Sequence, residues 1–262
     1  MNHQFAQVCP TGVGVVSASS RGTAVTAGTS AGSFSASFYE LTASVEYDSQ
    51  GFWLHSVGSG SNQQQLKLYV GAAASETEFL HTFISVGGYD TVTMFVPILL
   101  PAGVRVTAKT SCNYQELSYI HLNLVRGTAP VPLASRGTLI GYSGSAGTNV
   151  DCGATANTKG SWAQLSASTS RGAKGFTLHI ADDASCDTNN TTVMDIGVGA
   201  SSSEVIVFGD AAHYQESYRS RSTVAGPVWT PIPAASRVAA RAQSSSNGAN
   251  SRVPVAAITL WE

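Results

Sequence analysis

Apolar and small polar residues alternate along most of the chain, and this period-two pattern predicts β-strands. The alternating segments of the first half are residues 34–38, 41–47, 52–57, 66–70, 91–96, 104–109 and 119–125. Those of the second half are residues 139–142, 162–167, 176–180, 193–198, 205–208, 228–232, 237–242 and 255–261. Residues 72–80 come nearest to a helical pattern without reaching it. About eight strands per half, separated by turns, predict antiparallel sandwiches of the jelly-roll type.

The second half of the chain repeats the first. Pro101–Lys109 reads PAGVRVTAK, and Pro233–Arg241 reads PAASRVAAR. Five further matches keep the same order: Ser20–Thr23 with Ser135–Thr138, Ala31-Gly32 with Ala146-Gly147, Gly51–His55 with Gly175–His179, residues 66–72 with 194–200, and Glu76 with Glu204. Such a repeat indicates that one module was used twice. We therefore expect an all-β protein of two tandem antiparallel β-sandwich domains, jelly-roll-like and related by internal duplication.

The repeat also predicts the domain boundaries. Residues 1–19 precede it and form an N-terminal arm, which we expect to become ordered on a neighbouring subunit. The first module covers residues 20–126 and the second covers residues 135–262. Residues 127–134 contain two prolines and are expected to be a short, stiff linker.

Composition narrows the class of partner. Charged residues make up 11% of the 262 residues and the formal net charge is −2, so no basic excess indicates a nucleic-acid partner. Residues 1–10 lack the basic and apolar regions of a signal peptide. No apolar run reaches the ~18 residues of a membrane span. A surface rich in Ser, Thr, Gly and Ala is typical of secreted β-proteins and virion proteins.

The four cysteines, Cys9, Cys112, Cys152 and Cys186, lie far apart, without CxxC spacing and at places that do not match between the two modules. We expect reduced, partly buried thiols rather than a shared disulfide or zinc framework. If one disulfide forms, Cys152 with Cys186 is the pair to test.

The repeated Pro-Ala-x-x-Arg motif supplies the first candidate site. Pro101 and Pro233 fix the backbone where the chain enters a strand. Arg105 and Arg237 fall on the face opposite their valine neighbours. Each arginine either ties a loop or a carboxylate across the sandwich, which we favour, or belongs to an interface.

Residues that could carry chemistry are few. His55 and His179 hold matching places on the face opposite Leu54 and Leu178, and we interpret them as strand histidines rather than as bases or ligands. Asp182, Asp183, Asp187 and Asp195 form a loose acidic group, which we interpret as a solvated turn rather than a calcium site. Residues 141–145 lack the GxSxG spacing of a nucleophile elbow. We expect no catalytic residue, cofactor or metal.

Aromatic side chains leave a second interpretation open. Trp53, Trp162 and Trp229 either stack on sugar rings or fill the core and interfaces of the sandwiches. Exposed, coplanar rings in one groove would favour sugar.

The tandem modules, the low-charge surface and the line Pro231–Ser245, PIPAASRVAARAQSS, resemble structural proteins of tailed-bacteriophage virions. Those proteins carry a similar line, Pro-Ala-Gly-x-Arg-[Val/Ile]-Ala-x-Arg, shortly before a C-terminal strand. The first module keeps the glycine at Gly103, whereas the second has Ala235 in its place.

The resemblance implies a non-enzymatic virion component: a capsid decoration, a neck or tail decoration, or a baseplate or fibre module. Its partners would be other virion proteins and further copies of itself, without nucleic acid or membrane. It would reside in the virion after assembly in the cytoplasm of the host bacterium. The alternative is a receptor-binding module that recognises a host-surface glycan. An enzyme such as a depolymerase is disfavoured, because it needs a carboxylate pair and the only matched acids, Glu76 and Glu204, each lie alone in their modules.

Overall fold

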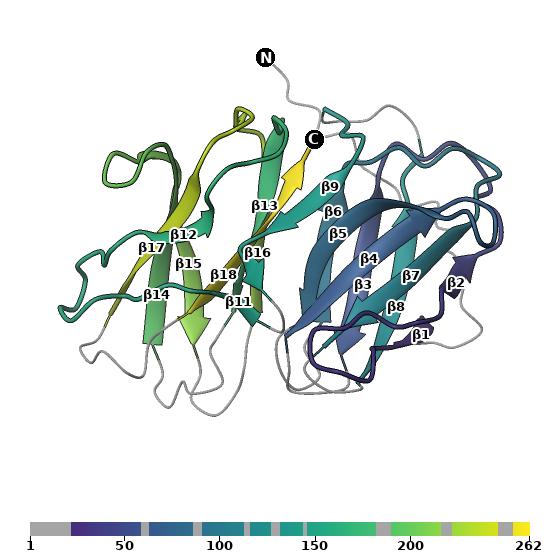
Figure 1. Ribbon diagram of the computed structural model, residues 1–262, viewed down its shortest axis with the longest axis horizontal. Helices are drawn as coiled ribbons and strands as arrows, with labels where there is room; N and C mark the ends of the chain where they lie inside the picture. Colours follow the sequence, from purple (N-terminus) through teal and green to yellow (C-terminus); the bar gives the residue numbers. More distant parts are fainter. Residues whose placement is uncertain are drawn as a thin grey trace, which may run out of the picture.

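The computed structural model describes residues 22–58, 63–85, 91–112, 116–126, 132–143, 146–181, 190–215, 222–245 and 254–262. These ranges contain eighteen strands and no helix, so the all-β prediction is confirmed. Two sandwiches lie side by side, the first from the early strands and the second from the late ones (Figure 1). The expected arm, residues 1–19, lies outside the described residues, as does most of the linker.

The first module contains eight of the described strands: β1 (Thr23–Thr26), β2 (Tyr39–Thr42), β3 (Phe52–Gly58), β4 (Gln64–Val70), β5 (Thr77–Ser85), β6 (Thr91–Val96), β7 (Val106–Ser111) and β8 (Leu117–Leu124). One sheet has the order β1-β8-β3-β6, and the facing sheet has the order β2-β7-β4-β5. This arrangement of eight strands in two sheets is that of a jelly roll.

The second module contains the remaining described strands: β9 (Gly137–Ile140), β10 (Tyr142–Ser143), β11 (Ala146–Asn149), β12 (Ala163–Ser166), β13 (Gly175–Ala181), β14 (Asn190–Val198), β15 (Val205–Gln215), β16 (Ser222–Val228), β17 (Val238–Ser244) and β18 (Val255–Trp261). Strand β13 lies between β16 and β18, and the opposite sheet has the order β12-β17-β14-β15. The strand order of the first module is thereby repeated.

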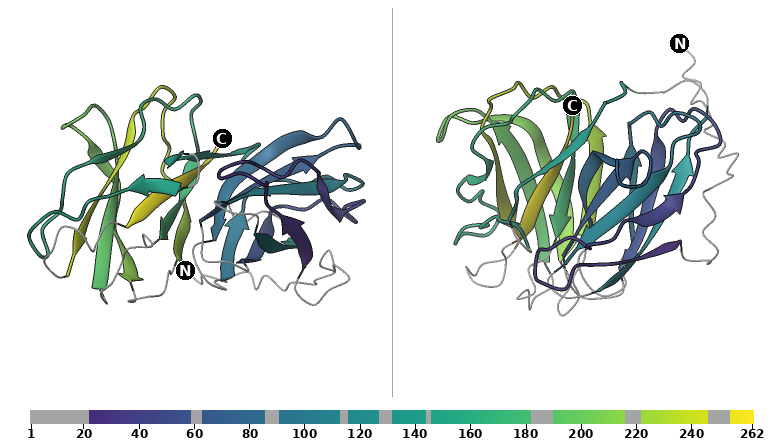
Figure 2. Two further views of the ribbon diagram at one scale, coloured as in Figure 1. Left: turned by 60° about the horizontal axis from the view of Figure 1, so that its bottom comes forward. Right: turned by 45° about the vertical axis from the view of Figure 1, so that its right-hand side comes forward.

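The two modules share one sheet. Leu80 of β5 pairs in parallel with Gly137 of β9, and β9 in turn pairs antiparallel with β18. The β2-β7-β4-β5 sheet therefore continues into the second module, and the views in Figure 2 show the two halves in close contact. Ala134, at the end of the expected linker, is buried and pairs with Ile98.

Apolar residues form one core cluster in each sandwich and a third cluster between them. The first cluster includes Trp261, the last strand residue of the second module. The third contains Phe83 from the first module and Leu139, Ala181, Val255 and Ala257 from the second. The hydrophobic effect therefore stabilises the module junction as well as each module.

Several strand predictions need correction. Residues 41–47 were predicted as a strand, but β2 ends at Thr42, and strands β1, β11 and β16 were not predicted. Residues 34–38 form a loop in which Phe34 makes one isolated bridge, and the prediction of a strand there was wrong. Strand β5 was missed, because Glu78 and His81 interrupt the apolar pattern. Residues 228–232 were predicted as a strand, but β16 ends at Val228.

The repeat register also changes at the start of the second module. Thr23 pairs with Ile120, and the residue at the equivalent position of β18, Ala256, pairs with Thr148 of β11. Matching Ser20–Thr23 to Ser135–Thr138 was therefore wrong, since β11 rather than β9 is the counterpart of β1. Strand β9 has no counterpart among the described residues of the first module.

Candidate assembly surfaces

Arg105 ties strand β2 to the loop before β5 in the first module. Its Nε donates to Glu40 Oε2 at 2.7 Å, and its Nη1 donates to Glu76 Oε1 at 2.8 Å. The Glu76 side chain is only 3% exposed, so the arginine supplies the countercharge that a buried carboxylate needs. The interpretation of Glu76 as an isolated acid was wrong, because Glu40 shares its arginine.

Arg237 repeats the arrangement in the second module. Its Nη1 donates to Glu204, whose side chain is 1% exposed, and its Nε donates to Gln164 Oε1 at 3.1 Å.

Both glutamates have lowered pKa values. The hydrogen bond from Arg105 holds the pKa of Glu76 below its ordinary value. Burial raises the pKa of Glu204, but hydrogen bonds from its own backbone and from Arg237 leave it lowered overall.

The turns that follow Pro101 and Pro233 place these arginines. Gly103 donates its N–H to Val45 O at 2.7 Å, and Ala235 donates to Thr169 O at 2.8 Å. Both residues have positive φ, +82° at Gly103 and +58° at Ala235. The two copies of the motif therefore build the same turn, although only the first uses the residue that adopts this conformation without strain.

The module junction buries one outer sheet face of the second module. We call it the junction face; its residues alternate with the core residues of β13 and β18, and all are buried: Thr177, His179, Ala181, Val255, Ala257, Thr259 and Trp261. Trp261 is 0% exposed and donates its indole N–H to Thr177 Oγ1 at 3.1 Å. A sheet whose two faces are both covered lies inside the molecule rather than at its surface.

The junction face packs on the side of the first sandwich where β5 and β6 form the sheet edges. We call this side the junction flank; its main residues are Leu80, Thr82, Phe83 and Met94. Thr82 Oγ1 lies 2.8 Å from Thr259 Oγ1 and 3.4 Å from His179 Nε2. Strand β18 contacts β5, and β16 contacts β6. Arg136 of the second module also lies 3.5 Å from Glu78 of β5.

His179 is the buried member of the matched histidine pair. It is 2% exposed, and its Nε2 lies 2.9 Å from Thr259 Oγ1. Desolvation lowers its pKa to about 3, so it is neutral at pH 7. The prediction that both histidines oppose the core is confirmed, but only His55 is partly exposed to solvent.

The equivalent outer face of the first module is open. We call it the open face; its residues on β3 and β8 are Trp53, His55, Val57, Tyr119, His121 and Asn123. Trp53 is 40% exposed, and its ring meets Phe95 edge to face at 5.4 Å. His55 Nδ1 lies 2.9 Å from Thr93 Oγ1, and His55 Nε2 lies 3.0 Å from Asn123 Nδ2. Burial, and then the neighbouring His121, lower the pKa of His55.

The flank of the second module is open as well. We call it the open flank; its residues on β15 and β16 are Val205, Ile206, Phe208, Ala211, Ala212 and Ala225. Val205 is 68% exposed and Ile206 is 47% exposed. Within the described ranges β15 pairs only with β14, so its other edge has no strand against it. An edge strand with exposed apolar side chains such as Val205 and Ile206 favours association with another chain; β15 also carries the exposed carboxylate of Asp210.

The three tryptophans proposed to stack on sugar lie in separate places. Trp53 belongs to the open face, whereas Trp229 packs against the first core beside the junction. Trp162 lies under the Arg241 guanidinium, 4.6 Å from the ring centroid. No single groove therefore contains them.

Asp195 is the other acidic residue whose interpretation changes. It is 3% exposed within β14, where Lys159 Nζ lies 2.7 Å from its Oδ1 and Arg241 Nε lies 2.9 Å from its Oδ2. Its assignment to a solvated turn was wrong. Asp182, Asp183 and Asp187 lie outside the described residues.

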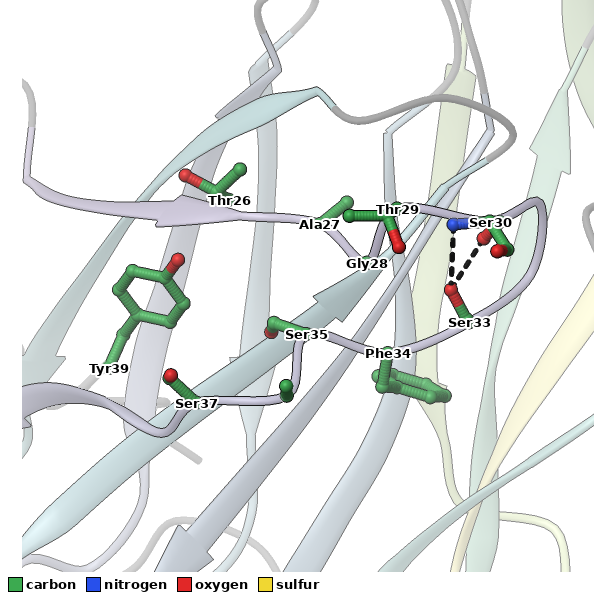
Figure 3. Close-up of a pocket in the computed structure, with 11 residues that line it drawn as sticks. Thr26, Ala27, Gly28, Thr29, Ser30, Ser33, Phe34, Ser35, Ser37 and Tyr39 are labelled. Atoms are coloured by element: carbon green, nitrogen blue, oxygen red, sulfur yellow. Dashed lines mark hydrogen bonds between the residues drawn. The ribbon is translucent and has the colours of Figure 1, made fainter.

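A polar pocket of about 460 Å³ lies in the loop between β1 and β2. Hydroxyl groups dominate its lining, and Ser33 Oγ donates to Ser30 O at 2.6 Å across the loop (Figure 3). Cys112 and Cys152 are buried, whereas Cys9 and Cys186 lie outside the described residues.

In the part of the chain that the structure describes, no group of three or more His, Cys, Asp or Glu side chains could hold a metal ion. The same ranges contain no helix that is long and apolar enough to cross a membrane.

The protein is a double jelly roll. The junction face and the junction flank are buried between its modules, whereas the open face and the open flank are not covered by the other module. No model of a known protein family matches the chain, and no curated protein matches it significantly. Among solved structures, PNGase F, a glycosylasparaginase from Flavobacterium meningosepticum, is 12% identical with a TM-score of 0.30, over 90% of this chain and 93% of that one. The N-terminal CBM22-1–CBM22-2 tandem domain of Paenibacillus barcinonensis Xyn10C is 11% identical with a TM-score of 0.23, over 81% and 79% of the two chains. At these TM-scores the two structures do not indicate a function for this chain.

Proposed function

We propose that the protein is a non-enzymatic structural component of a bacteriophage virion that acts through protein–protein assembly. The observation that carries the assembly role is the open flank, where Val205 and Ile206 leave an apolar strand edge in solvent. The virion assignment draws on the low-charge surface and on the resemblance of the line Pro231–Ser245 to phage proteins.

Burial of apolar surface supplies the driving force for such an assembly. Strand β5 of the first module differs from β15 at the position of Ile206. Glu78, the counterpart of Ile206, is charged and forms ion pairs with Lys67 and Arg136 at 2.8 and 3.5 Å. At the junction Glu78 contributes an ion pair with Arg136 of the second module, whereas the open flank has the exposed, apolar Ile206 at the same position. An exposed apolar residue on an edge strand favours pairing with another chain.

The mass of the purified protein in solution, with and without residues 1–19, tests the proposal. We expect a defined oligomer for the full chain. Loss of that oligomer on truncation would show that the arm takes part in assembly. A full-length chain that remains monomeric up to high concentration, and that binds no other virion protein, would refute the proposed function.

A second candidate function is recognition of a host-surface glycan. The exposure of Trp53 favours it, because His55 and Asn123 lie beside the ring on the same face and can form hydrogen bonds. Titration of the protein with polysaccharide from bacterial surfaces, followed by tryptophan fluorescence, tests this function. Saturable quenching that disappears in Trp53→Ala and persists in Trp162→Phe would support it.

A further inference from the structure

We infer that the partner at the open flank is a second copy of this chain, whose open face packs there as the junction face packs on the junction flank. This inference rests on the proposed assembly function and names its partner. The molecule already contains one such contact, between its own modules. The duplication leaves the matching face of the first module and the matching flank of the second open, while β9, which pairs with β5 at the junction, has no counterpart among the described residues of the first module.

The residues of the two faces correspond through their pairing registers. Phe52 pairs with Leu124, and Phe176 pairs with Leu260, which fixes the correspondence of the strands. The matching pairs are Thr177 with Trp53, Ala181 with Val57, Val255 with Tyr119, Ala257 with His121, and Thr259 with Asn123, while His179 matches His55. At each of the five unlike positions the open face has the larger side chain.

The two flanks also differ in side-chain size, but at three matched positions the open flank has the smaller residue. Leu66 pairs with Thr82 and Met194 pairs with Ala211, which fixes the correspondence of β5 and β15. The matching pairs are Thr82 with Ala211, Phe83 with Ala212, and Met94 with Ala225. At each of these positions the open flank has the smaller side chain, so it has room for the larger residues of the open face.

Other matched pairs reverse this rule. On the open flank Val205, Ile206 and Phe208 are larger than Thr77, Glu78 and Leu80 of the junction flank, and next to the open face Val125 is smaller than Trp261. Trp261 of the junction face and Leu80 of the junction flank both lie against Gly137. Their counterparts are Val125 and Phe208. The larger side chain of this pair is thus on the face at the junction and on the flank at the proposed contact, where no counterpart of Gly137 lies among the described residues. Close packing requires such complementary volumes.

The contact would join different surfaces of the two copies, because the flank and the face lie on different modules. Repetition of a heterologous contact produces a closed ring when the rotation closes and a helical filament when it does not. The inference therefore predicts head-to-tail association rather than a two-fold symmetric dimer.

Three full-length variants test the contact by sedimentation equilibrium. Ile206→Lys places a charge on the open flank, and Trp53→Lys places one on the open face. Leu99→Lys is the matched control, because Leu99 is 41% exposed and belongs to neither surface. All three side chains are exposed, so the folded structure should persist, which circular dichroism and thermal unfolding would verify. We expect Ile206→Lys and Trp53→Lys to be monomeric and Leu99→Lys to assemble like the wild type.

Mixing the two monomeric variants gives the decisive result. Trp53→Lys keeps an intact flank and Ile206→Lys keeps an intact face, so an equimolar mixture should form a dimer of twice the monomer mass and nothing larger. A mixture that stays monomeric would overturn the inference. Wild-type oligomers that survive both substitutions would overturn it too, while leaving the proposed assembly function standing. A monomeric wild type would overturn the inference, and a monomeric wild type that also binds no other virion protein would refute the proposed function.

Discussion

The junction face and the open face occupy the same place in two copies of one fold, yet one is buried and the other is not. Every residue of β13 and β18 is buried, whereas burial alternates residue by residue along β8. The junction face has Thr177, Ala181 and Ala257 where the open face has Trp53, Val57 and His121. Small outward residues let another module approach the sheet closely. The difference teaches that side-chain size on the outer face, rather than strand order, decides where a module docks.

The largest difference in the free energy of unfolding between the two faces is expected when their tryptophans, Trp261 and Trp53, are replaced. Trp261 is 0% exposed at the junction, so Trp261→Ala should lower the free energy of unfolding by about 3–5 kcal/mol. Trp53 is 40% exposed, and Trp53→Ala should cost less than about 1 kcal/mol. Urea unfolding of both substitutions in the monomeric Ile206→Lys background measures the two values without the contact between copies. Equal losses would show that the open face is covered in solution or that the junction is not formed.

The next largest effect is expected at the arginines. Arg105→Gln leaves Glu40 and Glu76 without their shared countercharge, whereas Arg237→Gln leaves Glu204 beside the neutral Gln164. Thermal unfolding at pH 7 should therefore show a larger loss of Tm for Arg105→Gln. Both variants should unfold earlier than the wild type.

The pH dependence of this loss follows from the lowered pKa values of Glu76 and Glu204. A carboxyl with a lowered pKa in the folded state contributes stability above its ordinary pKa and loses it as the pH falls through the folded value. The differences between wild type and variants should therefore shrink in acid. Differences of the same size at pH 7 and in acid would show that the arginines act through packing rather than charge.

The sequence predicts the sandwiches well, because alternation reports directly which residues face a core. It predicts the Arg–Glu contacts only in part. Arg105 and Glu76 recur as Arg237 and Glu204, and the recurrence of both residues in both modules was a signal that they meet. The same recurrence could have identified Arg105 as the partner of Glu76, which the sequence analysis interpreted as an isolated acid.

The junction could not be predicted in the same way. Alternation identifies one buried face of a strand, but the second face is buried only because residues far away in the sequence pack on it. The run Val255–Trp261 does carry a weak signal, since it has few polar residues on either face. Strand β5 was missed for a related reason: its Glu78 and His81 face outward while its other face joins the core. Such a strand is identified by its neighbours rather than by its own pattern.

A smaller effect is expected from the two histidines. The unfolded state binds a proton near pH 6.5, whereas His179 in the folded state binds one only near pH 3, so stability should fall as the pH drops below 6.5. The slope from this residue is at most about 1.4 kcal/mol per pH unit. His179→Gln should remove it, and His55→Gln, at the open position, should remove less. Urea unfolding between pH 7 and pH 4.5 measures both slopes, and equal changes would contradict the difference in burial.

The smallest effect is expected at the matched turns, and it tests whether the two modules are as alike in energy as in shape. A methyl group on Gly103 meets no atom within 4 Å, so Gly103→Ala adds only the strain of positive φ and should cost about 1 kcal/mol. Ala235→Gly removes that strain at φ +58° but adds freedom to the unfolded chain, for a net gain of about 0.5 kcal/mol. Thermal unfolding of the two variants and of the double variant measures both values. Opposite signs that add in the double variant would show that each turn acts within its own module, whereas a destabilised Ala235→Gly would show that the Ala235 methyl group makes a contact in the second module that the first does not need.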